Sequence, residues 1–328
     1  MKHFKVPSPG RLKALLRRFS GRRIIVIGDV ILDEYLFGDA RRISPEAPIP
    51  VVELREETIV PGAAAYVAAH VRHLGGEPVL CGVIGEDAAG ERIRSLLADR
   101  AIPASGLVGD PERPTIVKTR VIARNQQMLR IDRERLAPVS PAITRRLLDF
   151  VTGALKDADG LIFSDYDKGT LTPPLIAKVI RAARREGVPV AVNPKPNLAL
   201  VFHGAAVVSM NLEEATACLK RPLPDERALV KGGSELRRRL AARAVLVTRH
   251  SRGMGLFTRD GVEFIPSRAR EVFDGTGAGD TVIAVTGMGL AAGGMMADCV
   301  HLANSAAGIE VGKLGCALVS PAEIRREL

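Results

Sequence analysis

The segment 274–280 holds the residues whose types and spacing point most directly to chemistry. Two aspartates flank Thr-Gly-Ala-Gly, and the apolar run that follows predicts a helix. The backbone N–H groups of Gly277, Ala278 and Gly279 would then face an anion from the positive end of that helix. A carboxylate that only helped to bind a phosphate would repel it. We therefore expect Asp280 to take the proton from an attacking hydroxyl group during phosphoryl transfer.

A purely structural role is the alternative, because Gly-rich turns often precede helices and aspartate is favoured near a helix N-terminus. The seven-residue unit is more specific than a short Gly-x-Gly, and the chain lacks the Gly-x-x-x-x-Gly-Lys-Ser/Thr of the P-loop. The segment therefore predicts a kinase with another solution for handling phosphate. Asp274 would cap or brace the turn, and Thr276 would do the same or contact a nucleotide phosphate.

Continuous apolar runs at 23–28, 78–84, 160–164, 188–192, 205–210 and 244–248 predict strands that are buried on both faces of a parallel sheet. Helical patterns lie between many of them. This alternation favours an open, doubly wound α/β fold, in which ligands gather beyond the carboxyl ends of the strands. Polar residues follow several strands at these ends: Asp29, Asp165, Asn193, Lys195, Asn211 and Thr248.

The composition excludes several classes of site and location. Hydrophobic residues make up 46% of the 328 residues and aromatic residues only 4%, so we expect a core of Ala, Val, Leu and Ile. The four cysteines show no Cys-x-x-Cys spacing and the six histidines are scattered. The sequence therefore predicts neither a disulfide framework nor a zinc site, and the cytoplasm is the expected compartment.

The net charge of +10 raises the question of nucleic-acid binding. Much of this charge is local, because residues 1–28 carry eight Lys or Arg and no acid. Leu12, Leu15, Leu16 and Phe19 fall at helical spacing there, which predicts a basic amphipathic helix packed on the domain. No aromatic platform accompanies the charge, and no apolar stretch is long enough to span a membrane. We expect neither a nucleic acid nor a membrane as partner.

The segment 274–280 resembles the C-terminal signature of the ribokinase-like (PfkB-type) carbohydrate kinases. Other stretches resemble one subgroup, the D-glycero-β-D-manno-heptose 7-phosphate kinases, which form the kinase half of a bifunctional heptose kinase/adenylyltransferase of lipopolysaccharide core synthesis. These stretches are 28–35, 42–52, 124–132, 164–169 and 311–315. The phosphate-site motif is general to the superfamily, whereas the Ser-Pro-Glu-Ala-Pro and Arg-Asn-Gln-Gln sequences are much narrower.

The resemblance implies a ribokinase-like, doubly wound, mostly parallel sheet flanked by helices, with a small β lid over the sugar. Two β-rich segments, 51–55 and 115–121, interrupt the alternation of strand and helix and would suit such a lid. We expect one kinase domain over residues 1–328, with the lid formed by approximately 35–60 and 113–132. The resemblance also implies a homodimer that pairs through the lid.

For the nucleotide side, the resemblance implies ATP and Mg²⁺, with room for a monovalent cation. Asn211 would face the phosphates, and Glu214 would hold the Mg²⁺ through water, as suits a metal that prefers oxygen ligands and retains its waters. The alternative for this pair is a simple helix cap followed by first-turn acids. Thr248, Gly253 and Asn304 would line the nucleotide edge, although Asn304 would also suit a packed core amide.

For the sugar side, the resemblance implies that Asp33 accepts hydrogen bonds from a vicinal diol. The subgroup pattern Pro-Gly-Gly-Ala-Ala-Asn contacts the sugar, and this chain departs from it at Ala63 and Tyr66 while keeping Gly62. Basic residues near the lid would bind the phosphate of the substrate. The pool is Arg41, Arg42, Lys118, Arg120, Arg124 and Arg130, of which Lys118 and Arg124 are the first candidates.

The leading hypothesis is an ATP-dependent kinase that phosphorylates the anomeric hydroxyl of the heptose 7-phosphate to give the 1,7-bisphosphate. The sequence ends about where the kinase half would end, which fits a one-activity form or a truncated one. A kinase for another sugar or sugar phosphate is the alternative within the same class, motivated by Ala63 and Tyr66. A degenerate kinase that senses nucleotide or sugar is the alternative from another class, and the intact Asp280 argues against it.

Overall fold

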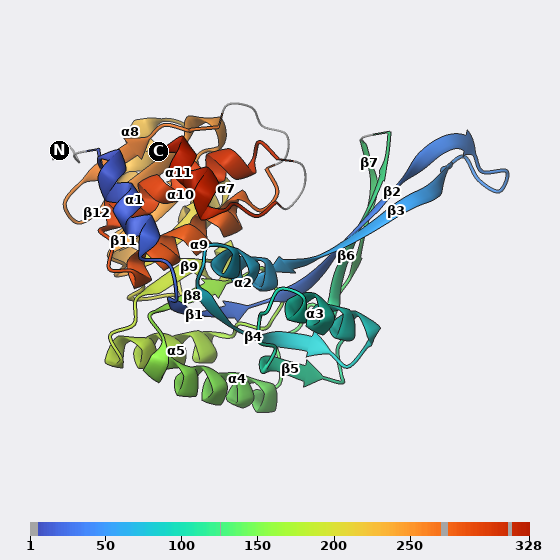
Figure 1. Ribbon diagram of the computed structural model, residues 1–328, viewed down its shortest axis with the longest axis horizontal. Helices are drawn as coiled ribbons and strands as arrows, with labels where there is room; N and C mark the ends of the chain where they lie inside the picture. The colour runs from blue at the N-terminus through green and yellow to red at the C-terminus, as the bar shows by residue number, and fades with distance from the viewer. Residues whose placement is uncertain (1–5, 125, 270–274, 314–316) are drawn as a thin grey trace.

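The computed structural model describes residues 6–124, 126–269, 275–313 and 317–328. In this part of the chain, a mostly parallel sheet of nine strands has the order β13-β12-β11-β10-β9-β8-β1-β4-β5, and β12 runs antiparallel to both of its neighbours, β11 and β13 (Figure 1). The strands are β1 (Arg23–Gly28), β4 (Glu77–Gly85), β5 (Gly106–Asp110), β8 (Gly160–Ser164), β9 (Val190–Asn193), β10 (Val207–Asn211), β11 (Ala244–Thr248), β12 (Met254–Thr258) and β13 (Val262–Ile265).

Helices cover both faces of this sheet, which is why its strands are apolar on both sides. Along β1, Ile24 and Val26 enter one hydrophobic core, while Ile25 and Ile27 enter the other. The first core is closed by α1 (Pro9–Arg17), α2 (Ala64–His73), α3 (Ala88–Ala98), α9 (Ala278–Ala291), α10 (Met296–Glu310) and α11 (Pro321–Glu327). The second is closed by α4 (Pro141–Ala154), α5 (Pro173–Arg185), α6 (Pro196–Ala199), α7 (Leu212–Leu219) and α8 (Glu226–Arg239). The predicted doubly wound α/β fold is confirmed.

The basic N-terminal segment forms α1, which packs on the domain. Leu12, Leu15 and Leu16 are buried in the first core, and Arg11 donates to Asp298 of α10 at 2.8 Å. The apolar face of this helix is therefore already covered by the protein. Within the described residues, no helix combines the length and apolar character needed to cross a bilayer.

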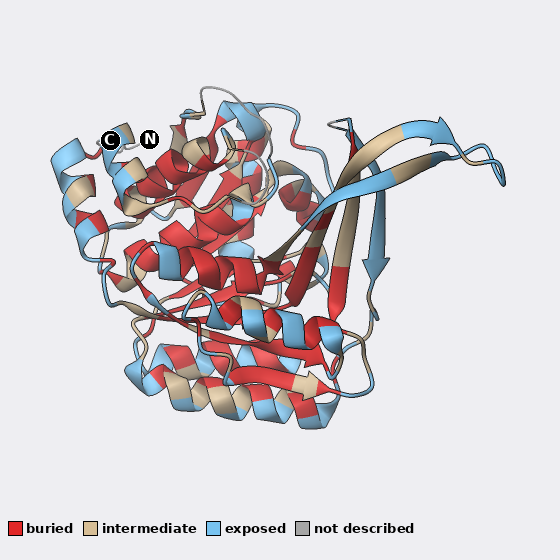
Figure 2. Cartoon of the chain, turned by 45° about the vertical axis from the view of Figure 1, so that its right-hand side comes forward, coloured by how far each residue is buried: buried red, intermediate tan, exposed pale blue. Residues whose placement is uncertain are grey.

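A second sheet projects from the end of the large one as a long, curved ribbon (Figure 1). It consists of β2 (Val30–Ile43), β3 (Pro50–Ala63), β6 (Ile116–Ala123) and β7 (Gln126–Arg133), in the order β3-β2-β6-β7 among the described residues. We call it the lid. Because β2 follows β1 after a single residue, the lid is rooted where the carboxyl ends of the parallel strands lie. Its base is buried and its far end is exposed (Figure 2).

The lid returns to the domain through Ala63, whose backbone is strained. This residue ends β3 and precedes α2 with φ 51° and ψ −124°, a combination that glycine adopts easily and L-residues adopt at a cost of about 1–3 kcal/mol. The glycine of the subgroup pattern at this position suits that backbone, and alanine does not.

We expect Ala63→Gly to stabilise the protein by about 1 kcal/mol, because relief of strain exceeds the added chain entropy of about 0.4–1 kcal/mol in the unfolded state. Urea denaturation would measure the gain. Ala64→Gly is the matched control, since Ala64 is the first residue of α2, and glycine should be neutral or destabilising there. Equal destabilisation by both substitutions would contradict the claim that the backbone of Ala63 is strained.

Candidate active site

Helix α9 begins with a glycine turn whose amides are open. Gly277 precedes it with φ 93°, and a Cβ at this position would lie 2.7 Å from Glu310 and 2.8 Å from the ring of Tyr66. In the described chain, the amides of Gly277, Gly279 and Asp280 donate to no acceptor, while that of Ala278 makes a long bond of 3.5 Å to the Gly275 carbonyl. Judged on the described residues, the start of the helix thus offers three free donors and one weakly engaged donor at its positive end.

Asp280 is the third residue of α9, and its side chain is 4% exposed. Its Oδ2 accepts a hydrogen bond from the Tyr166 hydroxyl at 2.6 Å, while Oδ1 is buried with no hydrogen-bond partner among the described residues. Burial raises the pKa of Asp280 to about 7, against the opposing effects of the Tyr166 hydrogen bond and the Lys195 charge. A carboxylate with one unsatisfied oxygen and a near-neutral pKa suits a general base.

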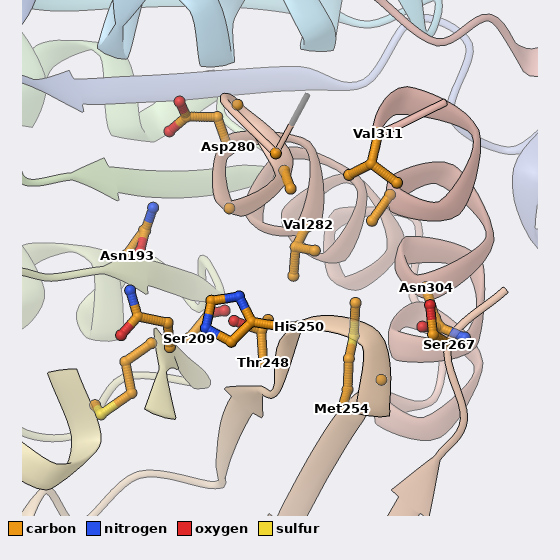
Figure 3. Close-up of a pocket in the computed structure, with 18 of the residues that line it drawn as sticks. Asn193, Ser209, Thr248, His250, Met254, Ser267, Asp280, Val282, Asn304 and Val311 are labelled. Atoms are coloured by element: carbon orange, nitrogen blue, oxygen red, sulfur yellow. The ribbon is translucent and has the colours of Figure 1, made fainter. Parts of the chain in front are cut away.

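Asp280 lies at one end of a cavity of about 360 Å³, which is in the range of small-molecule sites. The cavity runs across the carboxyl ends of β9, β10 and β11, where the fold places ligands. Figure 3 shows Asp280 at one end and Asn304 with Ser267 at the other, with the apolar side chains of Met254 and Val282 between them. A ligand with a polar tail near Asp280 and a flat apolar group beside Met254 and Val282 would fit this cavity.

Asn211 and Glu214 form a capping box at the start of α7. The Asn211 side chain accepts from the Glu214 amide at 2.7 Å, and Glu214 accepts from the Asn211 amide at 2.9 Å. The alternative stated for this pair, a helix cap followed by first-turn acids, is therefore present. Both residues also line the cavity, where Lys195 donates to Glu214 at 2.6 Å. Lys195 is thus paired, whereas a strand-end lysine would ordinarily be solvated.

A magnesium ion bound beside the start of α7 would have one carboxylate to bind, that of Glu214. No cluster of three or more His, Cys, Asp or Glu side chains positioned for a metal occurs in the part of the chain that the structure describes. The Glu214 carboxylate retains lone pairs toward the cavity, and its side chain is 11% exposed. This donor set fits a hydrated Mg²⁺ held mainly by ligand phosphates and waters, and it does not fit a protein cage.

The three residues predicted for the nucleotide edge, Thr248, Gly253 and Asn304, all line the cavity. Gly253 has φ 78°, and a Cβ there would lie 2.0 Å from the Ile265 carbonyl, so the wall requires glycine. Asn304 donates to the Pro266 carbonyl at 2.9 Å and so holds the same wall as a packed amide. Thr276 is exposed and is not among the lining residues, and Asp274 lies outside the described residues.

The sugar-side prediction centres on Asp33, a buried residue of β2 in the lid. Its Oδ1 accepts from Arg120 at 2.5 Å, and its Oδ2 lies 2.0 Å from where a Cβ of Gly62 would stand. Glycine at 62 is therefore what lets the Asp33 carboxylate take this position. The negative charge of Asp33 contributes to the raised pKa of Asp280, so the lid carboxylate lies within electrostatic range of the base.

Three other residues predicted for the sugar side lie in different surroundings. Lys118 is enclosed by Asp132 at 2.9 Å and Glu134 at 3.8 Å, so its charge is already balanced. Arg124 lies exposed just after β6, at the far end of the lid. Tyr66 is buried beneath Gly277, with its hydroxyl 3.5 Å from Glu310. Contacts of Lys118, Arg124 and Tyr66 with the sugar or its phosphate stay predictions.

Sequence reasoning missed Tyr166 as a site residue, although it lies in the 164–169 stretch and directly follows a predicted strand end. Its contact with Asp280 joins residues 114 positions apart. The Lys195 ammonium lies 5.4 Å from the centre of the Tyr166 ring, which links this side chain to Glu214 as well. Proximity to the strand end was the available signal for Tyr166.

Comparison with known proteins identifies the family that the chain matches. Residues 22–323 match the model of the family described as pfkB family carbohydrate kinase. The chain is 42% identical over 318 residues to the bifunctional protein HldE of Citrifermentans bemidjiense, covering 97% of this chain and 65% of that protein. It is 45% identical over 301 residues to the protein of the same name from Geobacter sulfurreducens, covering 92% of this chain and 61% of that protein. The chain thus spans less than two thirds of these relatives.

Solved structures share the fold at lower identity. A ribokinase from Arabidopsis thaliana, complexed with ribose and ATP, superposes with a TM-score of 0.74 at 18% identity, over 94% of this chain and 98% of that one. The tetrameric inhibited form of phosphofructokinase-2 from Escherichia coli gives a TM-score of 0.77 at 20% identity, over 93% and 97% of the two chains. These similarities support the architecture.

Proposed function

Because the chain belongs to the pfkB family of carbohydrate kinases, we propose that it transfers phosphate from ATP to the anomeric hydroxyl of D-glycero-β-D-manno-heptose 7-phosphate, giving the 1,7-bisphosphate. The observation that carries the chemistry is that, among the described residues, neither Oδ1 of Asp280 nor the amides of Gly279 and Asp280 have a hydrogen-bond partner. The heptose assignment is supported by the 42–45% identity to the HldE proteins over more than nine tenths of the chain.

In this proposal, each end of the cavity has its own task. The amides at the start of α9 stabilise negative charge on the phosphoryl oxygens, and the Asp280 Oδ1 accepts the proton of the acceptor hydroxyl. Asn211 and Lys195 provide donors for the phosphates of the nucleotide, and Glu214 holds hydrated Mg²⁺. ATP supplies the phosphoryl group, and Mg²⁺ neutralises the charge on its phosphates. The other end of the cavity, near Met254 and Asn304, receives the adenine ring of ATP.

A phosphorylated substrate is supported by the charge on the lid. Arg120 and Arg130 stand directly opposite each other across β6 and β7, so their side chains share one face. Each is paired with one carboxylate, Arg120 with Asp33 and Arg130 with Asp132, and a guanidinium group has several N–H donors with which it can also bind a phosphate. We propose that these two arginines bind the phosphate of the sugar.

ADP release tests the proposal. Protein would be mixed with ATP, Mg²⁺ and one of four acceptors: heptose 7-phosphate, fructose 6-phosphate, ribose or fructose. We expect turnover with heptose 7-phosphate. Turnover confined to another sugar would remove the heptose assignment and leave the kinase, an alternative that the departure at Ala63 motivates. ATP binding without turnover on any acceptor would favour the sensor hypothesis.

We also propose that residues 1–328 form one kinase domain, with the lid (β2, β3, β6 and β7) over the acceptor. The compartment that fits an ATP-dependent reaction is the cytoplasm. A monovalent cation near the phosphate site remains part of the proposal. An activity assay in sodium, potassium and choline salts at matched ionic strength would test for it.

Pairing of two chains through the lid is supported by apolar side chains on its surface. All eight residues of the edge strand β7 are exposed, and Met128, Leu129 and Ile131 are 42%, 55% and 52% exposed. Single residues of this kind are ordinary, but three on one edge strand indicate a contact surface. The opposite edge of the lid adds Leu54, which is 56% exposed.

We expect light scattering to give the mass of two chains for the native protein and of one chain for Leu129→Asp, because a carboxylate in the interface would be buried without a partner. Leu200→Asp, at a leucine that is 39% exposed after α6, is the control and should remain dimeric. A native monomer at micromolar concentration would contradict lid pairing.

A further inference from the structure

The loop after β8 holds Tyr166 in a single position beside the base. The buried carboxylate of Asp29 accepts hydrogen bonds from three amides of this loop, those of Tyr166 at 2.8 Å, Lys168 at 3.2 Å and Thr170 at 3.1 Å. Asp165 accepts from the amides of Asp167 and Lys195, both at 2.9 Å. Two buried carboxylates thus fix the backbone on either side of the tyrosine, which is the support that a preorganised site requires.

The Tyr166 hydroxyl makes the two carboxylate oxygens of Asp280 different from each other. Oδ2 accepts the phenol proton at 2.6 Å, whereas Oδ1 has no partner in the described residues. A carboxylate bound at one oxygen cannot rotate freely, so its other oxygen is held in one direction. The sequence of contacts from Asp29 through Tyr166 to Asp280 therefore sets the direction of the unoccupied lone pairs.

We propose that Tyr166 is the positioning residue of the phosphoryl transfer: its phenol anchors Asp280 Oδ2 and thereby assigns Oδ1 as the atom that accepts the proton of the sugar hydroxyl. This inference rests on the proposed kinase activity. It assigns a task to a residue that sequence reasoning left without one.

The same hydrogen bond determines where the base titrates. Burial raises the pKa of Asp280 to about 7, and the hydrogen bond from Tyr166 is the largest effect that opposes this rise. The other charged groups acting on Asp280 are Lys195 after β9, which lowers its pKa, and Asp33 of β2 and Glu214 of α7, which raise it. Tyr166 is the member of this set that donates a hydrogen bond to the carboxylate.

Tyr166→Phe tests the inference, because it removes one oxygen and keeps the ring. We expect the pH midpoint of kcat/KM to rise by about one unit, since a hydrogen bond to a charged group favours the ionised form by about that much. The variant should therefore lose about fivefold in kcat/KM at pH 7 through titration of Asp280, and much less at pH 9, with the KM for ATP unchanged. A pH midpoint that does not move would show that the phenol does not act on the ionised carboxylate, and it would overturn the proposal.

A double-mutant cycle separates action through Asp280 from any other effect. In the Asp280→Asn background, Tyr166→Phe should change the residual kcat by less than about twofold, because the group through which it acts is already gone. Full additivity of the two losses would overturn the inference. A wild-type protein that is inactive on every acceptor would instead remove the proposed function, so the two failures are distinguishable.

Discussion

Asp280→Asn is expected to lower kcat by about 100- to 10,000-fold with little change in the KM for ATP, because the variant keeps the shape of the side chain and loses its basicity. The same substitution should stabilise the protein at alkaline pH. Burial raises the pKa of Asp280 to about 7, so the folded protein holds that proton more tightly than the unfolded chain does. Ionisation therefore costs stability as pH rises from about 4, and the cost is complete above pH 7.

Steady-state kinetics and urea denaturation at pH 4 and pH 8 would measure both effects on the Asp280→Asn variant. It should be more stable than the wild type at pH 8, and the difference should disappear below pH 4. Asp298→Asn is a close control, because Asp298 is also the third residue of its helix and also 4% exposed, but it pairs with Arg11 far from the cavity. Retention of activity by Asp280→Asn would contradict its role as base.

Gly277→Ala is expected to lower kcat by about 100- to 1,000-fold, the loss typical of a removed donor at an oxyanion site. The added Cβ would lie 2.7 Å from Glu310 and 2.8 Å from Tyr66, both buried, and the φ of 93° disfavours alanine. The turn must therefore shift, and the amides at the start of α9 move with it.

The control for Gly277→Ala lies at the other end of the same helix. Gly293 also has a positive φ, of 70°, but a Cβ there would meet no atom within 4 Å. Gly293→Ala should therefore lower stability by about 1–2 kcal/mol and leave kcat within about twofold of the wild type. Comparable loss of kcat in both variants would show that strain, and not the position of the amides, causes the effect.

Sequence reasoning succeeded where one physical rule dominates locally. The strands were predictable because a strand of a covered parallel sheet must be apolar on both faces, as Ile24 to Ile27 are in β1. The start of α9 was predictable because a small-residue turn before an apolar helix leaves amides free. Residues of the nucleotide side, such as Asn211 and Thr248, were found because the fold gathers strand ends at one edge.

The surroundings of the other site candidates depend on side-chain directions that a linear pattern does not contain. Lys118 is neutralised by Asp132 and Glu134, and that pairing requires the register of β6 against β7. Tyr66 of α2 reaches Glu310 at the end of α10, which is 244 positions away, and both side chains lie beside Gly277. Tyr166 became visible as a site residue only when its hydroxyl was placed beside Asp280. Each case is a long-range contact between side chains whose separate roles looked ordinary.

The most direct test of the account is a crystal structure with a non-hydrolysable ATP analogue, Mg²⁺ and the sugar phosphate. We predict the γ-phosphoryl group against the amides of Gly279 and Asp280, and the acceptor hydroxyl within hydrogen-bonding distance of Asp280 Oδ1. A γ-phosphoryl group bound elsewhere, or an acceptor hydroxyl with no contact to the Asp280 carboxylate, would contradict the central claim.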